Sequence, residues 1–111
     1  MKKIETILDA LPQIAGKRLY IWGAGKFGIP LANYLRKHDV NVLGIIDNKM
    51  AGKCIDGFQV TLIDEVPEYA KIFIAVSNKR FNTEILQQIS DADKSLTAIR
   101  YEELYEEDMN I

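Results

Sequence analysis

Residues 18–28 read Arg18-Leu-Tyr-Ile-Trp-Gly-Ala-Gly-Lys-Phe-Gly28, and this stretch decides the fold of the chain. Its first half is aromatic and β-branched, which is typical of a buried strand. Its second half has the spacing GxGxxG, in which Gly23 and Gly25 permit a sharp turn and Gly28 lets a helix lie close to the strand. The stretch therefore predicts a strand, a glycine turn and a helix in succession.

A second hydrophobic run supports this interpretation. Residues 40–46 are mostly aliphatic and end at Asp47, about 20 residues beyond the glycine turn, where nucleotide-binding folds carry an acidic residue. The intervening residues 26–38 place Gly28, Leu31, Ala32 and Leu35 at helical spacing. We therefore expect a right-handed strand-helix-strand unit.

The rest of the chain supplies shorter elements. Asp56-Gly57 lies between two short apolar segments and predicts a tight hairpin, and 71–76 reads as a third buried strand. A helix is expected over 82–90 with Asn82 as its N-cap. Further expected elements are a helix at 3–15, one helical turn at 62–66, a strand at 96–99 and a short terminal helix or tail at 101–107.

These elements predict one α/β domain over residues 1–111. We expect a three-layer α/β/α arrangement with a parallel sheet of about four strands in the order 2-1-3-4, and a short β-hairpin as an insertion. In such a sheet the ligand binds beyond the carboxyl ends of the strands, where the chain order reverses. Here the glycine turn and residues 77–80 would line that crevice.

Composition limits the classes of function. The 111 residues have 48% hydrophobic content and a formal charge of -2, so nothing predicts nucleic-acid binding. The apolar runs are too short to span a membrane, and no secretory leader is recognisable, so we expect a cytoplasmic protein. The one cysteine, Cys54, rules out an internal disulfide, and His38 at a helix end is a poor catalytic candidate.

The candidate ligand contacts all lie at the expected crevice. The N–H groups of the glycine turn can bind phosphate, although the same pattern also occurs as a tight turn without a ligand. Asp47 can accept a hydrogen bond from a ribose hydroxyl or can simply cap a turn. The predicted contacts are Gly23, Ala24, Gly25, Lys26, Phe27, Gly28, Asp47, Asn48, Ser77 and Asn78, with Lys79 and Arg80 beside them.

Three segments, 21–28, 42–48 and 52–60, together resemble the Rossmann-like N-terminal domain of bacterial sugar O-acyltransferases of the sialic-acid and bacillosamine type. The resemblance covers roughly residues 18–80 and implies a nucleotide-sugar ligand held by the glycine turn and by Asp47-Asn48. In those enzymes acetyl transfer takes place on a left-handed β-helix. The 111 residues contain no hexapeptide repeats and no counterpart of the histidine base, so no catalytic residue carries over.

Three hypotheses remain open at this stage. The first is a nucleotide-binding module, more a binding domain than a complete enzyme, for a nucleotide-sugar such as a UDP-sugar in bacterial surface-polysaccharide synthesis. The second is an NAD- or coenzyme A-binding domain related to oxidoreductases, acting as a homodimer or with a separate catalytic chain. The third is a degenerate fold that serves protein interaction.

Overall fold

The computed structural model describes residues 18–76 and 78–100 of the chain. In order, it contains β1 (Leu19–Trp22), α2 (Gly28–Lys37), β2 (Val42–Ile46), β3 (Cys54–Ile55), β4 (Phe58–Thr61), a 3-10 turn η1 (Ile63–Glu65), β5 (Lys71–Ile74), α3 (Lys79–Ala92) and β6 (Thr97–Arg100). The expected helix at 3–15 and the expected terminal segment at 101–107 lie outside the described residues.

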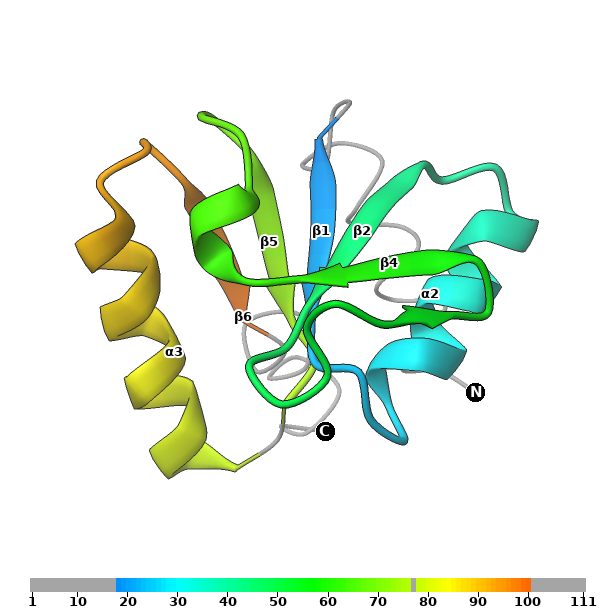
Figure 1. The fold of residues 1–111 in the computed structure, drawn as a ribbon, viewed down its shortest axis with the longest axis horizontal. Coiled ribbons are helices and arrows are strands. Elements are labelled where there is room, and N and C mark those ends of the chain that lie inside the picture. The colour runs from blue at the N-terminus through cyan, green and yellow to red at the C-terminus, as the bar shows by residue number, and fades with distance from the viewer. Residues whose placement is uncertain (1–17, 77, 101–111) are drawn as a thin grey trace, which may run out of the picture.

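These strands form one six-stranded sheet in the order β3-β4-β2-β1-β5-β6 (Figure 1). Every neighbouring pair is parallel except β3 and β4, which form an antiparallel hairpin. The hairpin turns at Asp56 (φ 51°) and Gly57 (φ 84°), where the sequence predicted a tight hairpin, and two positive φ angles are typical of a type I′ turn.

The expected Rossmann-like sheet of four parallel strands in the order 2-1-3-4 is wrong, because the sheet is mixed and has six strands. The strands that the sequence predicted do lie next to one another as β2-β1-β5-β6. The hairpin, however, is part of the sheet rather than an insertion beside it. Ile45 and Ile46 pair with Val60 and Thr61, so β4 covers the edge of β2 that would otherwise be unpaired.

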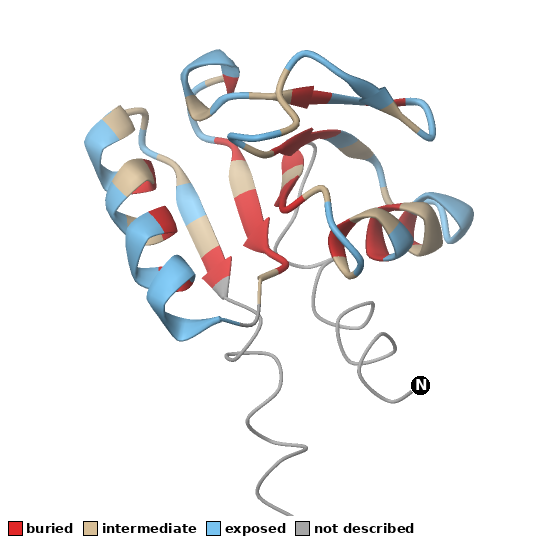
Figure 2. Cartoon of the chain, turned by 60° about the horizontal axis from the view of Figure 1, so that its bottom comes forward, coloured by how far each residue is buried: buried red, intermediate tan, exposed pale blue. Residues whose placement is uncertain are grey.

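Two apolar cores lie on opposite faces of the sheet. Leu19 and Ile21 of β1 face the core under α2, whereas Trp22 faces the core under α3. The predicted stripe of α2 is confirmed, since Gly28, Leu31, Ala32 and Leu35 are all buried. Figure 2 shows the buried residues on the sides of both helices that face the strands. The two helices therefore hold the sheet from both faces.

Candidate functional site

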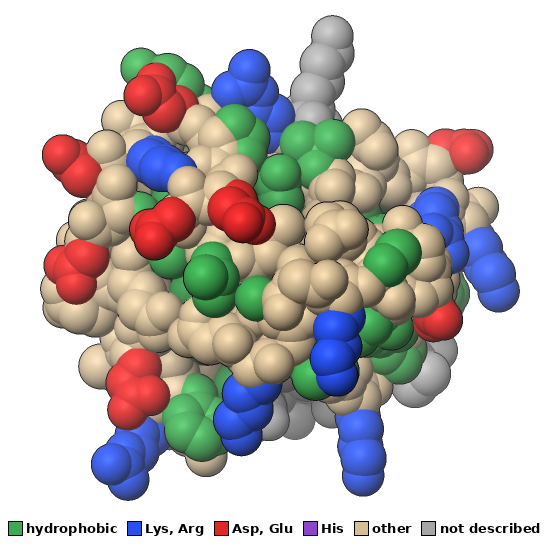
Figure 3. Space-filling view, viewed as in Figure 1, with side chains coloured by type: hydrophobic (Ala, Val, Ile, Leu, Met, Phe, Trp, Pro, Cys, Tyr) green, Lys and Arg blue, Asp and Glu red, His purple; other side chains and the backbone are tan. Residues whose placement is uncertain are grey.

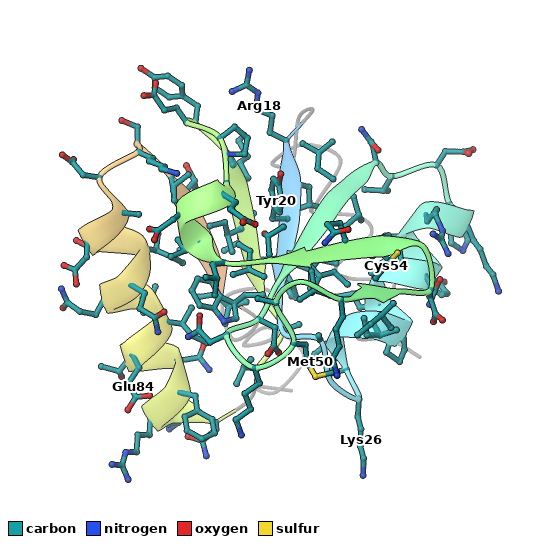
Figure 4. The ribbon with its side chains drawn as sticks, in the orientation of Figure 1. Arg18, Tyr20, Lys26, Met50, Cys54 and Glu84 are labelled. Carbon is teal, nitrogen blue, oxygen red and sulfur yellow. The ribbon has the colours of Figure 1, made fainter. Side chains whose placement is uncertain are left out.

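The carboxyl ends of β1, β2 and β5 meet at one edge of the sheet, which is the lower edge in Figure 1. The chain leaves these strands through the glycine turn, through the loop beginning at Asp47, and through the segment before α3. Figure 4 shows Lys26 projecting from this edge, with Met50 and Glu84 at the same end of the molecule. Most of the predicted ligand contacts are thus brought together here.

The glycines of the turn have three different roles. Gly23 has φ +122°, and a Cβ there would lie 3.2 Å from the carbonyl oxygen of Ala75. A Cβ on Gly28 would lie only 1.7 Å from the carbonyl oxygen of Gly23, so this glycine is required for the close approach of α2. A Cβ on Gly25 would meet nothing within 4 Å. The turn is therefore fixed at both ends and open in its middle.

The N-terminus of α2, which is the positive end of its dipole, has neither a side-chain cap nor an acidic residue in its first turn. Phe27, the N-cap residue, is half-buried and packs against the core under α2. Lys26 beside it is exposed. A helix end of this kind favours a negatively charged group.

Asp47 connects the glycine turn to the loop after β2. Its Oδ2 accepts a hydrogen bond from the Ala24 N–H at 2.9 Å. Its Oδ1 accepts from the N–H groups of Lys49 at 2.9 Å and Met50 at 3.1 Å. The carboxylate therefore does more than cap its own turn, as one prediction had it, because it also accepts a hydrogen bond from the backbone of the glycine turn. Its contact with a ribose stays a prediction.

The segment before α3 differs from the expectation in the identity of the cap. Asn78, not Asn82, caps the helix, and its side-chain oxygen accepts from the N–H groups of Arg80 at 2.9 Å and Phe81 at 3.2 Å. Asn82 is buried, and its amide donates to the carbonyl oxygens of Val76 and Asn78. The sequence misassigned the cap because α3 begins at Lys79, one turn earlier than its apolar spacing indicated. Ser77 lies outside the described residues.

A pocket of about 270 Å³ opens between the loop after β2 and the first turns of α3. Its walls combine apolar side chains with the polar groups of two loops and one helix. The lining residues are Trp22, Gly23, Asp47, Asn48, Lys49, Val76, Phe81, Glu84, Ile85 and Gln88. Gly23, Asp47 and Asn48 were predicted as contacts, whereas the residues from α3 were not. The other predicted contacts that the structure describes lie outside this lining: Ala24, Gly25, Lys26, Phe27, Gly28 and Asn78.

The wall formed by α3 had a recognisable pattern in the sequence. Phe81, Glu84, Ile85 and Gln88 follow the spacing of one helix face. Phe81 is 52% exposed, although phenylalanine side chains in folded proteins are usually buried. In the sequence, this wall was indicated by an apolar residue, Phe81, at the start of the helix face that also carries Glu84 and Gln88.

Basic side chains collect around the same edge. Lys26 follows β1, Lys49 follows β2, and Lys79 and Arg80 follow β5, and all four are exposed. Blue side chains are visible along the lower part of the molecule in Figure 3. Of the acidic groups here, Asp47 is bonded to backbone N–H groups and Glu84 lies 3.9 Å from the Nε of Arg80. The edge is thus locally basic although the whole chain has a formal charge of -2.

Other chemistry has little support at this edge. Cys54 is exposed on the hairpin strand β3, away from the pocket lining. Over residues 18–76 and 78–100, His, Cys, Asp and Glu side chains form no group of three or more that could hold a metal ion. Within those same ranges, no helix is long and apolar enough to cross a membrane.

Comparison with known proteins identifies the family. A family model described as C2185-like, N-terminal matches residues 15–99. The chain belongs to this C2185-like N-terminal family. The match includes the glycine turn, the hairpin and α3, so the candidate site lies entirely within the family domain. No curated protein and no solved structure gives a significant match to the chain.

Proposed function

We propose that this C2185-like N-terminal domain binds a nucleotide at the carboxyl edge of its sheet. The observation that carries the proposal is that an open glycine turn, a pocket with both apolar and polar walls, and a set of basic side chains meet around Asp47. An anion at the turn and a flat ring system in the pocket are the two halves of a nucleotide.

The phosphate would lie over the middle of the glycine turn. There, a Cβ on Gly25 would meet no atom within 4 Å, the end of α2 lacks a side-chain cap, and Lys26 is exposed. Backbone N–H groups at a helix end and a lysine ammonium both stabilise a phosphate. By contrast, at the N-terminus of α3 the N–H groups of Arg80 and Phe81 already donate to the Asn78 side chain, so this helix end is the poorer anion site.

The base would enter the pocket against Trp22 and Phe81. Aromatic side chains stack on bases, and the stacking contributes about 1–3 kcal/mol per base. Between the base and the phosphate the ribose would reach Asp47, whose Oδ2 accepts one hydrogen bond within the protein. A carboxylate oxygen has two lone pairs, so Oδ2 retains one site for a ribose hydroxyl.

The size of the pocket suits a single base. Sites that enclose a drug-sized ligand measure roughly 300–1,000 Å³, so about 270 Å³ holds a base and leaves the phosphates and any attached sugar outside. This agrees with a nucleotide-sugar or one half of NAD as ligand. The resemblance to sugar O-acyltransferase domains favours the nucleotide-sugar.

Nucleotide-dependent thermal stabilisation tests the proposal. Melting temperatures are measured with AMP, ADP, CDP, UDP, UDP-sugars and NAD, because a ligand that binds the folded state at 100 times its Kd stabilises it by about 2.7 kcal/mol. We expect stabilisation by diphosphates to exceed that by the monophosphate. Absence of stabilisation by every nucleotide at millimolar concentration would contradict the proposal and favour an interaction module.

Two variants with one matched control locate the site. Gly25→Val fills the open space above the turn, and Lys26→Gln removes a charge there, so both are expected to weaken nucleotide binding severalfold or more while the protein stays folded. Lys37→Gln removes another exposed charge, at the far end of α2, and should leave binding unchanged. Equal effects of Lys26→Gln and Lys37→Gln would show that the anion does not lie at the turn.

A further inference from the structure

One face of α3 presents hydrogen-bonding groups to the pocket. Glu84 and Gln88 lie one helical turn apart, and both line the pocket with the apolar Ile85 between them. Glu84 is exposed and stands at the rim, whereas Gln88 is half-buried. A ring that enters the pocket would therefore meet a carboxylate near its outer edge and an amide further in.

The unused hydrogen-bonding capacity of this face is specific. The Oε1 of Gln88 accepts from the Nδ2 of Asn48 at 3.1 Å, so the Gln88 amide retains its two N–H donors. Glu84 lies 3.9 Å from the Nε of Arg80, which exceeds hydrogen-bonding distance. Within residues 18–76 and 78–100, no side chain or backbone N–H donates a hydrogen bond to its carboxylate. The face thus offers an acceptor at Glu84 and donors at Gln88.

We propose that this face selects a base with an exocyclic amino group beside a ring-nitrogen acceptor, as in adenine and cytosine. The inference rests on the proposed nucleotide binding and makes its ligand class narrower. The exocyclic group projects furthest from the ring and reaches Glu84 at the rim, where an amino group donates to the carboxylate. The adjacent ring nitrogen accepts from the Gln88 amide.

The oxo bases reverse both interactions. In hypoxanthine and uracil the exocyclic group is a carbonyl oxygen, which the Glu84 carboxylate repels, and the adjacent ring nitrogen carries a hydrogen that faces the Gln88 donors. An unpaired or opposed polar group in a partly enclosed site lowers affinity by about tenfold or more. The inference thus favours adenine or cytosine nucleotides over the uridine nucleotide implied by the resemblance to acyltransferase domains.

Two matched pairs of ligands test the selection. Calorimetry gives the dissociation constants of ADP and IDP, and of CDP and UDP. Within each pair the second nucleotide has a carbonyl oxygen in place of the amino group and a hydrogen on the adjacent ring nitrogen, and the pair is otherwise identical. We expect the amino member to bind about tenfold more tightly in each pair. A preference in only one pair would identify that base as the ligand class and still support the selection.

Variants of the carboxylates complete the experiment. Glu84→Gln should bring the ratio of dissociation constants within each pair close to one, because an amide both donates and accepts. Glu65→Gln removes an exposed carboxylate on η1 outside the pocket and should keep the wild-type ratio. Ratios near one in the wild type, or ratios that survive Glu84→Gln, would overturn the inference while nucleotide binding itself stands. If none of the four nucleotides binds, the proposed function fails first.

Discussion

Replacing Gly28 with alanine tests the geometry of the glycine turn directly. The new Cβ would lie 1.7 Å from the Gly23 carbonyl oxygen, about 1.3 Å inside the 3.0 Å that real Cβ contacts keep. If α2 moves away by that amount, Leu31 and Leu35, which are fully buried, lose about half of their packing energy. Burial of each leucine contributes roughly 1.5–3 kcal/mol, so half of the sum for the two leucines predicts a loss of about 1.5–3 kcal/mol in the free energy of unfolding.

Urea denaturation followed by tryptophan fluorescence measures this loss. Trp22 is the one tryptophan of the chain and is buried in the core under α3, so its emission reports unfolding. Gly25→Ala is the matched control and should change the free energy of unfolding by less than about 0.5 kcal/mol, because its Cβ meets nothing within 4 Å. A Gly28→Ala variant as stable as Gly25→Ala would refute the described approach of α2 to the turn.

Three further predictions concern the surroundings of the site. Arg36 donates from α2 to the hairpin backbone and its guanidinium lies 4.3 Å from the centre of the Phe58 ring, so Arg36→Ala should cost about 1–2 kcal/mol in urea denaturation, whereas Lys37→Ala should cost less than about 0.5. Asn82→Ala removes the donor for two backbone carbonyl groups and should cost about 1–3 kcal/mol by the same assay; a neutral result would contradict the described bonds. Burial raises the pKa of Tyr20 above its ordinary value of 10.0, so the folded state holds this proton more tightly. Its contribution to stability is complete below pH 10 and is lost as the pH rises through the folded-state pKa, and Tyr20→Phe should remove that part of the alkaline decline in a pH series of melting temperatures.

Local sequence patterns predicted the glycine turn and the helix after it well. Gly28 has a steric requirement that only glycine meets, and Leu31 and Leu35 repeat at the helical period, so both follow from residues close together in the sequence. The hairpin was equally local, because Asp56-Gly57 needs two positive φ angles. Each of these predictions depended on a few neighbouring residues.

Features that depend on distant parts of the chain could not be read in the same way. Nothing near Val60 indicates that β4 pairs with β2 rather than lying outside the sheet, because register is decided by the edge that is available. Asn78 and Asn82 are both asparagines near the start of α3. They differ in the structure because Asn78 accepts from the Arg80 N–H as the N-cap, whereas Asn82 is buried and donates to the Val76 carbonyl oxygen. The pocket required Asn48 and Gln88 to meet from two elements that are remote in sequence.

The most direct test of the nucleotide site is a titration of the isotope-labelled domain with ADP, followed by amide NMR spectra. The site predicts saturable shifts that are largest for the backbone N–H groups of Gly25 and Lys26 and for the indole N–H of Trp22. The amide signals of Cys54 and Ile55 in the hairpin serve as the control. These residues lie outside the pocket lining, so their signals should remain unchanged. Saturable shifts centred on the hairpin, or no shifts with ADP, CDP or UDP at millimolar concentration, would contradict a nucleotide site at the carboxyl edge of the sheet.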